Sequence, residues 1–379
     1  MKLLTATIVL SLVAAAPAGA QLGDILKKAG QARDEVKSLT ISAEDEQAIG
    51  AGVSERVRTR YGVVQDPAVH RYVALVGTVL AQASSRPGLP WTFVVLDTDG
   101  VNAFAAPGGY IHVTRGALAL AHSEAELAGV LAHEITHVTE KHTVSAIQKN
   151  KLVQRGANEA LKGNAALLNA YVDRAFEMVY AGFGRAEELE ADQKGVALAN
   201  RVGYAPRALA EFLARLNERN SASQEKQGLF ASHPEMNERL DRISKQVAAD
   251  KLASTAALAD RYRKFITYQP RPQTEITVVE SGSAGLTGGS GSKDAKGNGT
   301  KDKGAAASDP PKKSGAFGPG ALAKAAGGSE KKSTEVTASG GSRGVDAERN
   351  AKGGSKPALV AVSLTPGDVA AFKKEGGLL

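Results

Sequence analysis

The feature that most limits how this chain can fold is a change of composition near residue 280. From Ser42 to about Tyr268, apolar residues recur at helical spacing between turn signals, as they do in globular domains. Residues 269–357 are instead dominated by glycine, serine, alanine and lysine, which bury too little apolar surface to offset the entropy of an ordered chain. We therefore expect one folded domain within residues 21–268, with its core at about 42–248, followed by a flexible low-complexity tail.

The first 20 residues have the features of a secretory signal peptide. A lysine precedes an apolar run from Leu3 to Ala16, and the small residues Ala18 and Ala20 then form a cleavage site. No other stretch of the sequence approaches the roughly 18 consecutive apolar residues that a membrane-spanning helix needs. We expect cleavage after Ala20 and an exported, soluble protein; an uncleaved N-terminal anchor is the alternative.

The positive charge of the chain is concentrated in the tail. The whole sequence has a formal net charge of +7, and residues 281–357 hold thirteen Lys and Arg against seven Asp and Glu. The folded part is therefore nearly neutral, so we expect no nucleic-acid partner, although the basic tail could contact the envelope or a membrane surface. The absence of cysteine excludes disulfides, thiolate metal ligands and a lipoprotein anchor.

The last stretch, residues 358–379, regains some apolar character after the tail. It could form a short docking helix at about residues 366–375. A frayed terminus is equally compatible with these residues, and the sequence favours neither.

The folded part is predicted to be an α+β domain in which helices dominate. Ser42 and Asp66 are placed to cap two N-terminal helices, and three β-rich runs after them are expected to form a small sheet. The expected elements are helices at 42–62 and 66–83, strands at 91–97, 101–106 and 110–114, and helices at about 123–142, 185–201 and 206–219, with a last helix opening at 232–240.

The helix expected at residues 123–142 carries two histidines at metal-binding spacing. His133 and His137 lie four residues apart, so one helix face presents both imidazoles to a single metal ion. Glu134 lies beside that face, and the three form the H-E-x-x-H arrangement, in which histidines hold zinc and the glutamate is a general base. A chance match occurs in on the order of one per cent of chains of this length, but the capped amphipathic helix around the motif argues against chance.

Two histidines leave such a site one ligand short, because catalytic zinc usually has three protein ligands and an open position. The acidic stretch "GRAEELEADQKG" offers Glu187, Glu188, Glu190 and Asp192. Glu188 and Asp192 share a helix face, so one carboxylate could bind the metal while another accepts a hydrogen bond from a ligand histidine. Without the upstream motif, a solvated acidic face would be the better interpretation.

Four motifs in this order resemble those of the HtpX-like and CAAX-prenyl-protease-type zinc metallopeptidases of the gluzincin group. They are "NAFAAPGGYIHVTRGAL", "HEITH", "GRAEELEAD" and "SHPEMNERL", and the resemblance extends over roughly residues 42–248. It implies a zincin-like fold with a small sheet beside an active-site helix, and one Zn²⁺ per chain.

The resemblance also implies roles for particular residues. His133, His137 and Glu188 would bind the zinc ion, and Glu134 would be the catalytic base that activates a water molecule on the metal. Asp192 would support a ligand histidine through a hydrogen bond.

Further residues of the motifs also have counterparts in the family. His233 matches a family histidine that stabilises the oxyanion or occupies the open position of the metal, and capping of a helix is its alternative role. Arg185 matches a family arginine to which we assign a structural or ligand-supporting role. The remaining histidines are expected to be structural or surface residues: His70, His112, His122 and His142.

Together these features predict a periplasmic zinc metalloendopeptidase that hydrolyses peptide bonds in unfolded or misfolded envelope proteins. The alternative is a gated or weakly active chaperone-like or scaffold protein, whose site is blocked by His233 or by residues 143–184. The presence of Glu134 favours the enzyme, because a scaffold has no need of a general base.

The run "PGGYIHVT", residues 107–114, is expected to be an edge strand beside the cleft. An extended peptide could add to such an edge through main-chain hydrogen bonds, which depend little on side chains. This mode of binding suits an enzyme that cleaves unfolded polypeptides.

Overall fold

The computed structural model describes residues 41–149, 165–221, 236–271, 278–280, 334–336 and 358–379. The predicted signal peptide and His233 lie outside these ranges, as does most of the tail predicted at residues 269–357. Within them the chain is an α+β fold in which helices dominate, as the sequence predicted. No helix in the described ranges is long and apolar enough to cross a membrane.

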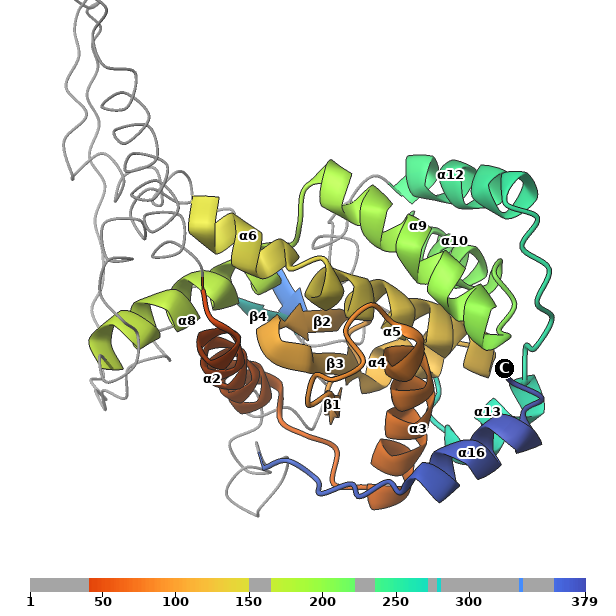
Figure 1. Ribbon diagram of the computed structural model, residues 1–379, viewed down its shortest axis with the longest axis horizontal. Helices are drawn as coiled ribbons and strands as arrows, with labels where there is room; N and C mark the ends of the chain where they lie inside the picture. The colour runs from red at the N-terminus through yellow and green to blue at the C-terminus, as the bar shows by residue number, and fades with distance from the viewer. Residues whose placement is uncertain (1–40, 150–164, 222–235, 272–277, 281–333, 337–357) are drawn as a thin grey trace, which may run out of the picture.

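The described helices gather around a small three-stranded sheet (Figure 1). The strands of this sheet are β1 (Thr92–Leu96), β2 (Ala103–Ala106) and β3 (Tyr110–Thr114), with a 3-10 turn at Pro107–Gly109, and a separate pair consists of β4 (Val278–Glu280) and β5 (Thr334–Val336). The helices are α2 (Ala43–Tyr61), α3 (Pro67–Ala83), α4 (Arg115–Leu120), α5 (Glu124–Thr139), α6 (His142–Lys149), α8 (Ala165–Ala181), α9 (Arg185–Val202), α10 (Ala208–Ser221), α12 (Met236–Ala249), α13 (Ala259–Phe265) and α16 (Pro366–Glu375).

The sheet corrects one prediction, because β3 is its central strand and not an edge. The strand order is β1-β3-β2, with β1 parallel and β2 antiparallel to β3. Residues 111–114 of β3 are buried whichever face they point to, because helices such as α2 and α5 pack on the sheet. The outer edge of β1 is partly covered, since the Val64 N–H donates to the Val95 carbonyl at 3.0 Å. The edge that packs against α5 is therefore β2.

The predicted helix caps form. The Ser42 hydroxyl accepts a hydrogen bond from the Asp45 N–H at 3.0 Å, and the Ser123 hydroxyl accepts one from the Glu126 N–H at 3.2 Å. The Glu126 carboxylate reaches back to the N–H of His122 at 3.0 Å, one residue before the position that a capping box would use. Each helix thus begins at a serine whose hydroxyl accepts a hydrogen bond from an otherwise unpaired backbone N–H of the first turn.

Helix α5 is the central element of the core. It packs against α9, α3, α10 and β2, and every residue from Glu124 to Val138 is buried. Figure 1 shows it between the sheet and the pair α9 and α10. Because no side of this helix faces solvent, the polar side chains on it must find partners inside the protein.

The C-terminal segment forms a helix, α16, over the residues where the sequence allowed one. Figure 1 shows α16 beside α3, although the two lie at opposite ends of the described chain. The ring of Phe372 is buried, and its centroid lies 4.0 Å from the guanidinium carbon of Arg261. The Arg71 guanidinium binds the Asp368 carboxylate at 2.7 Å. This segment therefore packs into the core of the domain.

Candidate metal centre

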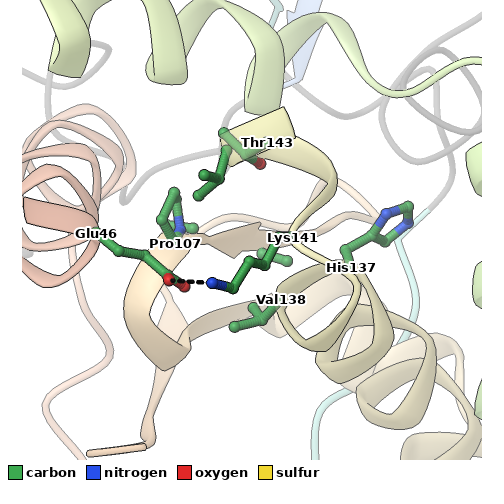
Figure 2. A pocket seen from close by; sticks show the side chains of 9 residues that line it. Glu46, Pro107, His137, Val138, Lys141 and Thr143 are labelled. Atoms are coloured by element: carbon green, nitrogen blue, oxygen red, sulfur yellow. Dashed lines mark ion pairs between the residues drawn. The ribbon is translucent and has the colours of Figure 1, made fainter. Parts of the chain in front are cut away.

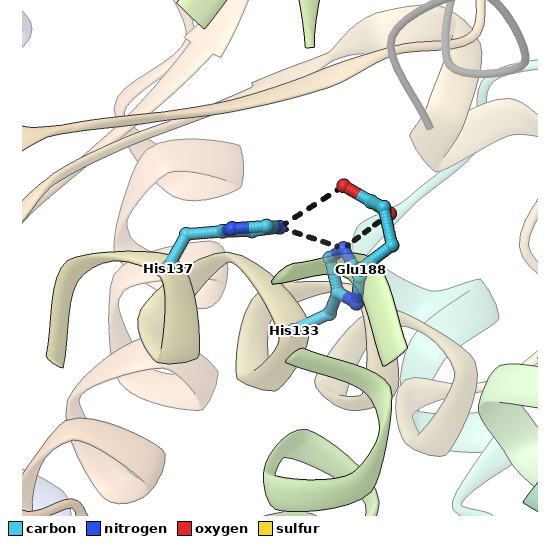
Figure 3. A group of neighbouring side chains, drawn as sticks. All are labelled: His133, His137 and Glu188. Carbon is cyan, nitrogen blue, oxygen red and sulfur yellow. Dashed lines mark hydrogen bonds and ion pairs between the residues drawn. The ribbon is translucent and has the colours of Figure 1, made fainter. Parts of the chain in front are cut away.

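Three side chains from α5 and α9 converge on one point (Figure 3). The helical spacing places the Nε2 atoms of His133 and His137 3.0 Å apart, and the Glu188 carboxylate faces both rings, with 3.5 Å from Oε2 to His133 Nε2 and from Oε1 to His137 Nε2. All three side chains are buried. The sequence-predicted ligand set is thus brought together by the fold.

A glycine allows the two helices to approach this closely. A Cβ atom on Gly195 of α9 would lie 2.9 Å from the backbone nitrogen of His133, a distance that real Cβ atoms essentially never show. Only the absence of a side chain lets α9 pack on the backbone of α5. The carboxylate of Glu188 can then reach the histidines of the neighbouring helix.

The donor set fits a divalent metal ion. One ligand atom from each of His133, His137 and Glu188 lies within 4.8 Å of the other two. Two imidazole nitrogens and one carboxylate oxygen are a donor set typical of catalytic zinc, which keeps its fourth position open.

The ring of His133 is held from behind by a buried ion pair. Its Nδ1 lies 2.9 Å from Asp192 Oδ1, and Arg239 donates two hydrogen bonds of 2.7 Å to the same carboxylate. Burial by itself would raise the pKa of Asp192, but the charges and hydrogen bonds of Arg239 and His133 together outweigh burial and hold that pKa below its usual value. Asp192 therefore remains an anionic acceptor for the His133 ring.

The protonation of His133 depends on these carboxylates. Burial lowers the pKa of His133, but the hydrogen bonds to Asp192 and Glu188 and the charges of these two carboxylates together outweigh burial and raise the pKa to about 9. A metal ion needs the neutral ring, so we expect metal binding to displace a proton from this group of residues.

Glu134 lies in the same buried environment. Only 1% of its surface is exposed, and its charge contributes to the raised pKa of the Arg239 guanidinium, as do the charges of Asp192 and Glu188. Glu134 directly follows His133 along α5, and its role as a general base stays a prediction.

Arg239 is a site residue that the sequence analysis missed, although it lies within the motif "SHPEMNERL". The buried residues of α12 are Met236, Arg239, Ile243 and Val247, which together make the apolar stripe of the helix. An arginine in such a stripe has to meet a buried carboxylate, and that pattern could have identified it. Its guanidinium also lies 3.3 Å from Glu188.

His142 also has a different environment from the one predicted. We expected it off the metal-binding face as a structural or surface residue, but it is buried and its Nδ1 lies 2.8 Å from Nδ1 of His137. The left-handed conformation of Lys141, with φ of 57°, turns the chain between α5 and α6. That turn brings His142 back against His137, a contact that helical spacing alone could not predict.

The other predicted residues lie farther from the donor atoms. Arg185 is exposed and its guanidinium pairs with Glu238 of α12, and its structural or ligand-supporting role stays a prediction. His70 and His112 are buried, and His122 is exposed, as structural or surface histidines would be. Of the segment 143–184, the structure describes α6 and α8 but not residues 150–164.

A small depression lies between the end of β2 and the C-terminal end of α5 (Figure 2). Glu46 binds Arg86 at 2.7 Å, accepts a hydrogen bond from the Gly108 N–H at 3.2 Å and lies 3.8 Å from Lys141. In Figure 2 the imidazole of His137 points away from this cluster. The cluster thus ties the turn before β3 to the end of α5 and is separate from the donor atoms.

Comparisons with known proteins agree with this geometry. Residues 67–247 match the model of peptidase family M48. The putative beta-barrel assembly-enhancing protease of Vibrio cholerae is 27% identical over 209 residues, which cover 52% of this chain and 43% of the relative. The beta-barrel assembly-enhancing protease of Escherichia coli strain K12 is 27% identical over 231 residues, covering 58% and 46%. Metalloprotease YcaL of the same strain is 27% identical over 223 residues, covering 57% and 85%.

The chain spans less than half the length of the first two relatives. The residues that the family model matches nevertheless include α5, α9 and most of α12, and with them each described side chain of the donor cluster and its buried supports. The resemblance inferred from the four motifs is therefore confirmed: residues 67–247 match peptidase family M48 and are similar to the metallopeptidases of that family.

Proposed function

We propose that the protein is a zinc-dependent metalloendopeptidase that hydrolyses peptide bonds in unfolded or misfolded envelope proteins. The observation that supports this proposal best is the convergence of His133, His137 and Glu188, with Glu134 beside them, in one buried group. In this proposal the three converging residues are the ligands of one zinc ion per chain. A bound zinc ion would supply polarisation of the scissile carbonyl and acidification of a water molecule.

The protein's own residues have to move the proton. Glu134 would accept a proton from the attacking water and pass it to the leaving amine, as a general base and then a general acid. Asp192 and Arg239 would keep His133 in the orientation that turns its Nε2 toward the metal. His233, which lies outside the described residues, keeps its predicted role in stabilising the oxyanion or gating the metal.

Substrates would bind as extended strands along β2, in place of the edge first expected at residues 107–114. β2 is the edge strand that packs against α5, and because its residues are only 0–3% exposed, the segments that cover it would have to move before a substrate pairs with it. Main-chain hydrogen bonds to an edge strand select for unfolded chains more than for particular side chains. Peptides methylated at alternate backbone nitrogens should therefore inhibit much more weakly than their unmodified counterparts.

The proposed location is the bacterial periplasm. The signal-like residues 1–20 and the name of the relatives, beta-barrel assembly-enhancing protease, support this proposal. The basic tail would add contact with the envelope or a membrane surface.

A gated or chaperone-like protein is the second candidate, and one observation favours it. The donor residues are only 0–3% exposed, so a substrate cannot reach them in this conformation without movement of the neighbouring segments. Such a protein would bind unfolded chains and cleave them slowly.

The decisive experiment compares the protein without residues 1–20 with its Glu134→Gln variant. We expect about one zinc ion per chain in both by elemental analysis, and cleavage of unfolded casein by the wild type alone. Zinc in both without cleavage in either would support the gated candidate. Absence of stoichiometric metal would reject the site assignment.

A further inference from the structure

The second histidine of the motif has a partner of its own. His137 Nε2 lies toward the donor cluster, while its Nδ1 lies 2.8 Å from Nδ1 of His142. On the far side, Nε2 of His142 lies 3.2 Å from Glu190 Oε2. The imidazole of His142 thus connects His137, the proposed metal ligand, to the carboxylate of Glu190 on α9.

Metal binding would fix every proton in this chain of contacts. A neutral imidazole that binds a metal through Nε2 carries its proton on Nδ1, so His137 has to donate to His142. His142 then accepts at Nδ1 and carries its own proton on Nε2, from which it donates to Glu190. The opposite tautomer of His142 would place two N–H groups against each other.

These contacts from His137 through His142 to Glu190 form a relay, and a lysine binds the carboxylate at its end. Lys194 binds Glu190 at 2.7 Å and Glu140, at the end of α5, at 2.6 Å. The Glu190 side chain is 42% exposed, whereas Asp192, which supports His133, is almost completely buried. The two ligand histidines are therefore held differently, one by a buried carboxylate and the other through a second imidazole.

An aromatic ring restrains His137 in the remaining direction. The ring of Phe183 stacks on its imidazole, with centroids 4.1 Å apart and an interplanar angle of 16°. Gly182, at φ of 85°, provides the left-handed backbone that places this ring after α8. Stacking fixes the plane of the imidazole, and the hydrogen bond from its Nδ1 fixes the rotation within that plane.

We propose that His142 is a positioning residue of the metal centre, which accepts the Nδ1–H of His137 and is itself held by Glu190. This inference rests on the proposed metal site and goes beyond it, because it assigns a role to a histidine outside H-E-x-x-H. Groups of this kind typically change metal affinity by about 10- to 100-fold when they are removed.

The test measures zinc affinity by competition with a chromophoric chelator at one pH. His142→Phe keeps a ring in the core but cannot accept the hydrogen bond, so its zinc affinity should fall by about 10-fold or more. His142→Asn places an amide oxygen near the position of Nδ1 and should recover part of the loss. Glu190→Gln should have a smaller effect, and Glu187→Gln, on the same helix but outside the relay, should have none.

Two measurements separate positioning from a purely structural role. The thermal transition of each metal-free variant reports stability alone, and ¹⁵N NMR of the zinc-loaded protein should show His142 protonated on Nε2 and not on Nδ1. Wild-type zinc affinity in His142→Phe, or a loss of stability without a loss of affinity, would overturn the inference and leave the proposed function intact. A wild type without zinc would overturn both.

Discussion

At the scale of single residues, Arg239 provides a buried positive charge to the described site. Its guanidinium is fully buried and interacts with Asp192 and Glu188, so it balances two carboxylates that otherwise repel each other. Removing one partner of a buried ion pair leaves an uncompensated charge, which is more costly than the pair is stabilising.

We expect Arg239→Met to lower the free energy of unfolding by about 3 kcal/mol or more, measured by urea denaturation of the metal-free protein. Arg239→Lys should recover little of this, because an ammonium cannot reproduce the paired hydrogen bonds to Asp192. A lysine variant as stable as the wild type would show that charge alone suffices.

His112 makes stability depend on pH. Burial, helped by the nearby charge of Arg58, lowers the pKa of His112 to about 3, and its Nε2 lies 2.9 Å from the Ser54 hydroxyl. The unfolded chain therefore binds a proton below pH 6.5 that the folded chain does not, so stability falls as pH decreases through that value.

Between pH 7 and pH 5 this residue alone should cost about 2 kcal/mol. Denaturant unfolding of wild type and His112→Gln at both pH values measures the difference directly. Whatever the stability of the variant at pH 7, its loss of stability between the two pH values should be smaller by this amount; equal losses would show that His112 does not titrate in this way.

Residue spacing predicts such contacts when the partners are close along the chain. His133 and His137 were identifiable because helical spacing alone places them together. His142 and Arg239 depend on contacts between separate elements, at a left-handed turn and at a helix crossing 47 residues from Asp192. Nothing local to His142 indicates that contact, whereas the apolar stripe of α12 does indicate a buried role for Arg239.

At the scale of elements, the positions of the three sheet strands and of most of the longer helices were predictable, but the order of the strands was not. β3 occupies residues 110–114 as expected, because alternating turns and β-branched residues are local signals. Its central place arises from the parallel pairing with β1, which is a long-range contact. Helices α6 and α8 were not predicted either. The next helix, α9, was predicted, and it carries the acidic residues of the site.

Gly195 provides a test of the contact between α5 and α9. We expect Gly195→Ala to push the helices apart and to weaken zinc binding, because its Cβ would meet the backbone of His133 at 2.9 Å. Gly88→Ala is the matched control, since a Cβ there has no neighbour within 4 Å. Chelator competition on both variants measures the effect. Equal zinc affinities would show that the helices can move apart enough to accommodate the Cβ without weakening the site.

At the scale of the whole molecule, the C-terminal segment is part of the folded core. Phe372 and Val369 are buried against the same cluster as the residues of α3, and Arg261 binds the Phe372 carbonyl at 2.9 Å while pairing with the buried Glu124. The composition of residues 358–379 allowed a helix but could not show where it packs.

We expect Phe372→Ala to lower the free energy of unfolding by about 3 kcal/mol, as other buried phenylalanines do when truncated. Leu359→Ala, at a side chain that is 46% exposed, should change it by less than about 0.5 kcal/mol. Thermal or denaturant unfolding of the full chain checks both. Equal stability of the two variants would mean that α16 detaches without consequence for the domain.

The same helix has a consequence for the order in which the molecule is made. The contacts of α16 and the segment before it join residues such as Arg71 and Ser363, which are 292 positions apart. During synthesis, the surface of α3 that will receive α16 emerges long before its partner, and closing so long a loop is slow. Nascent chains therefore pass through a stage in which the catalytic helices are complete but an apolar surface remains open to aggregation or to chaperones.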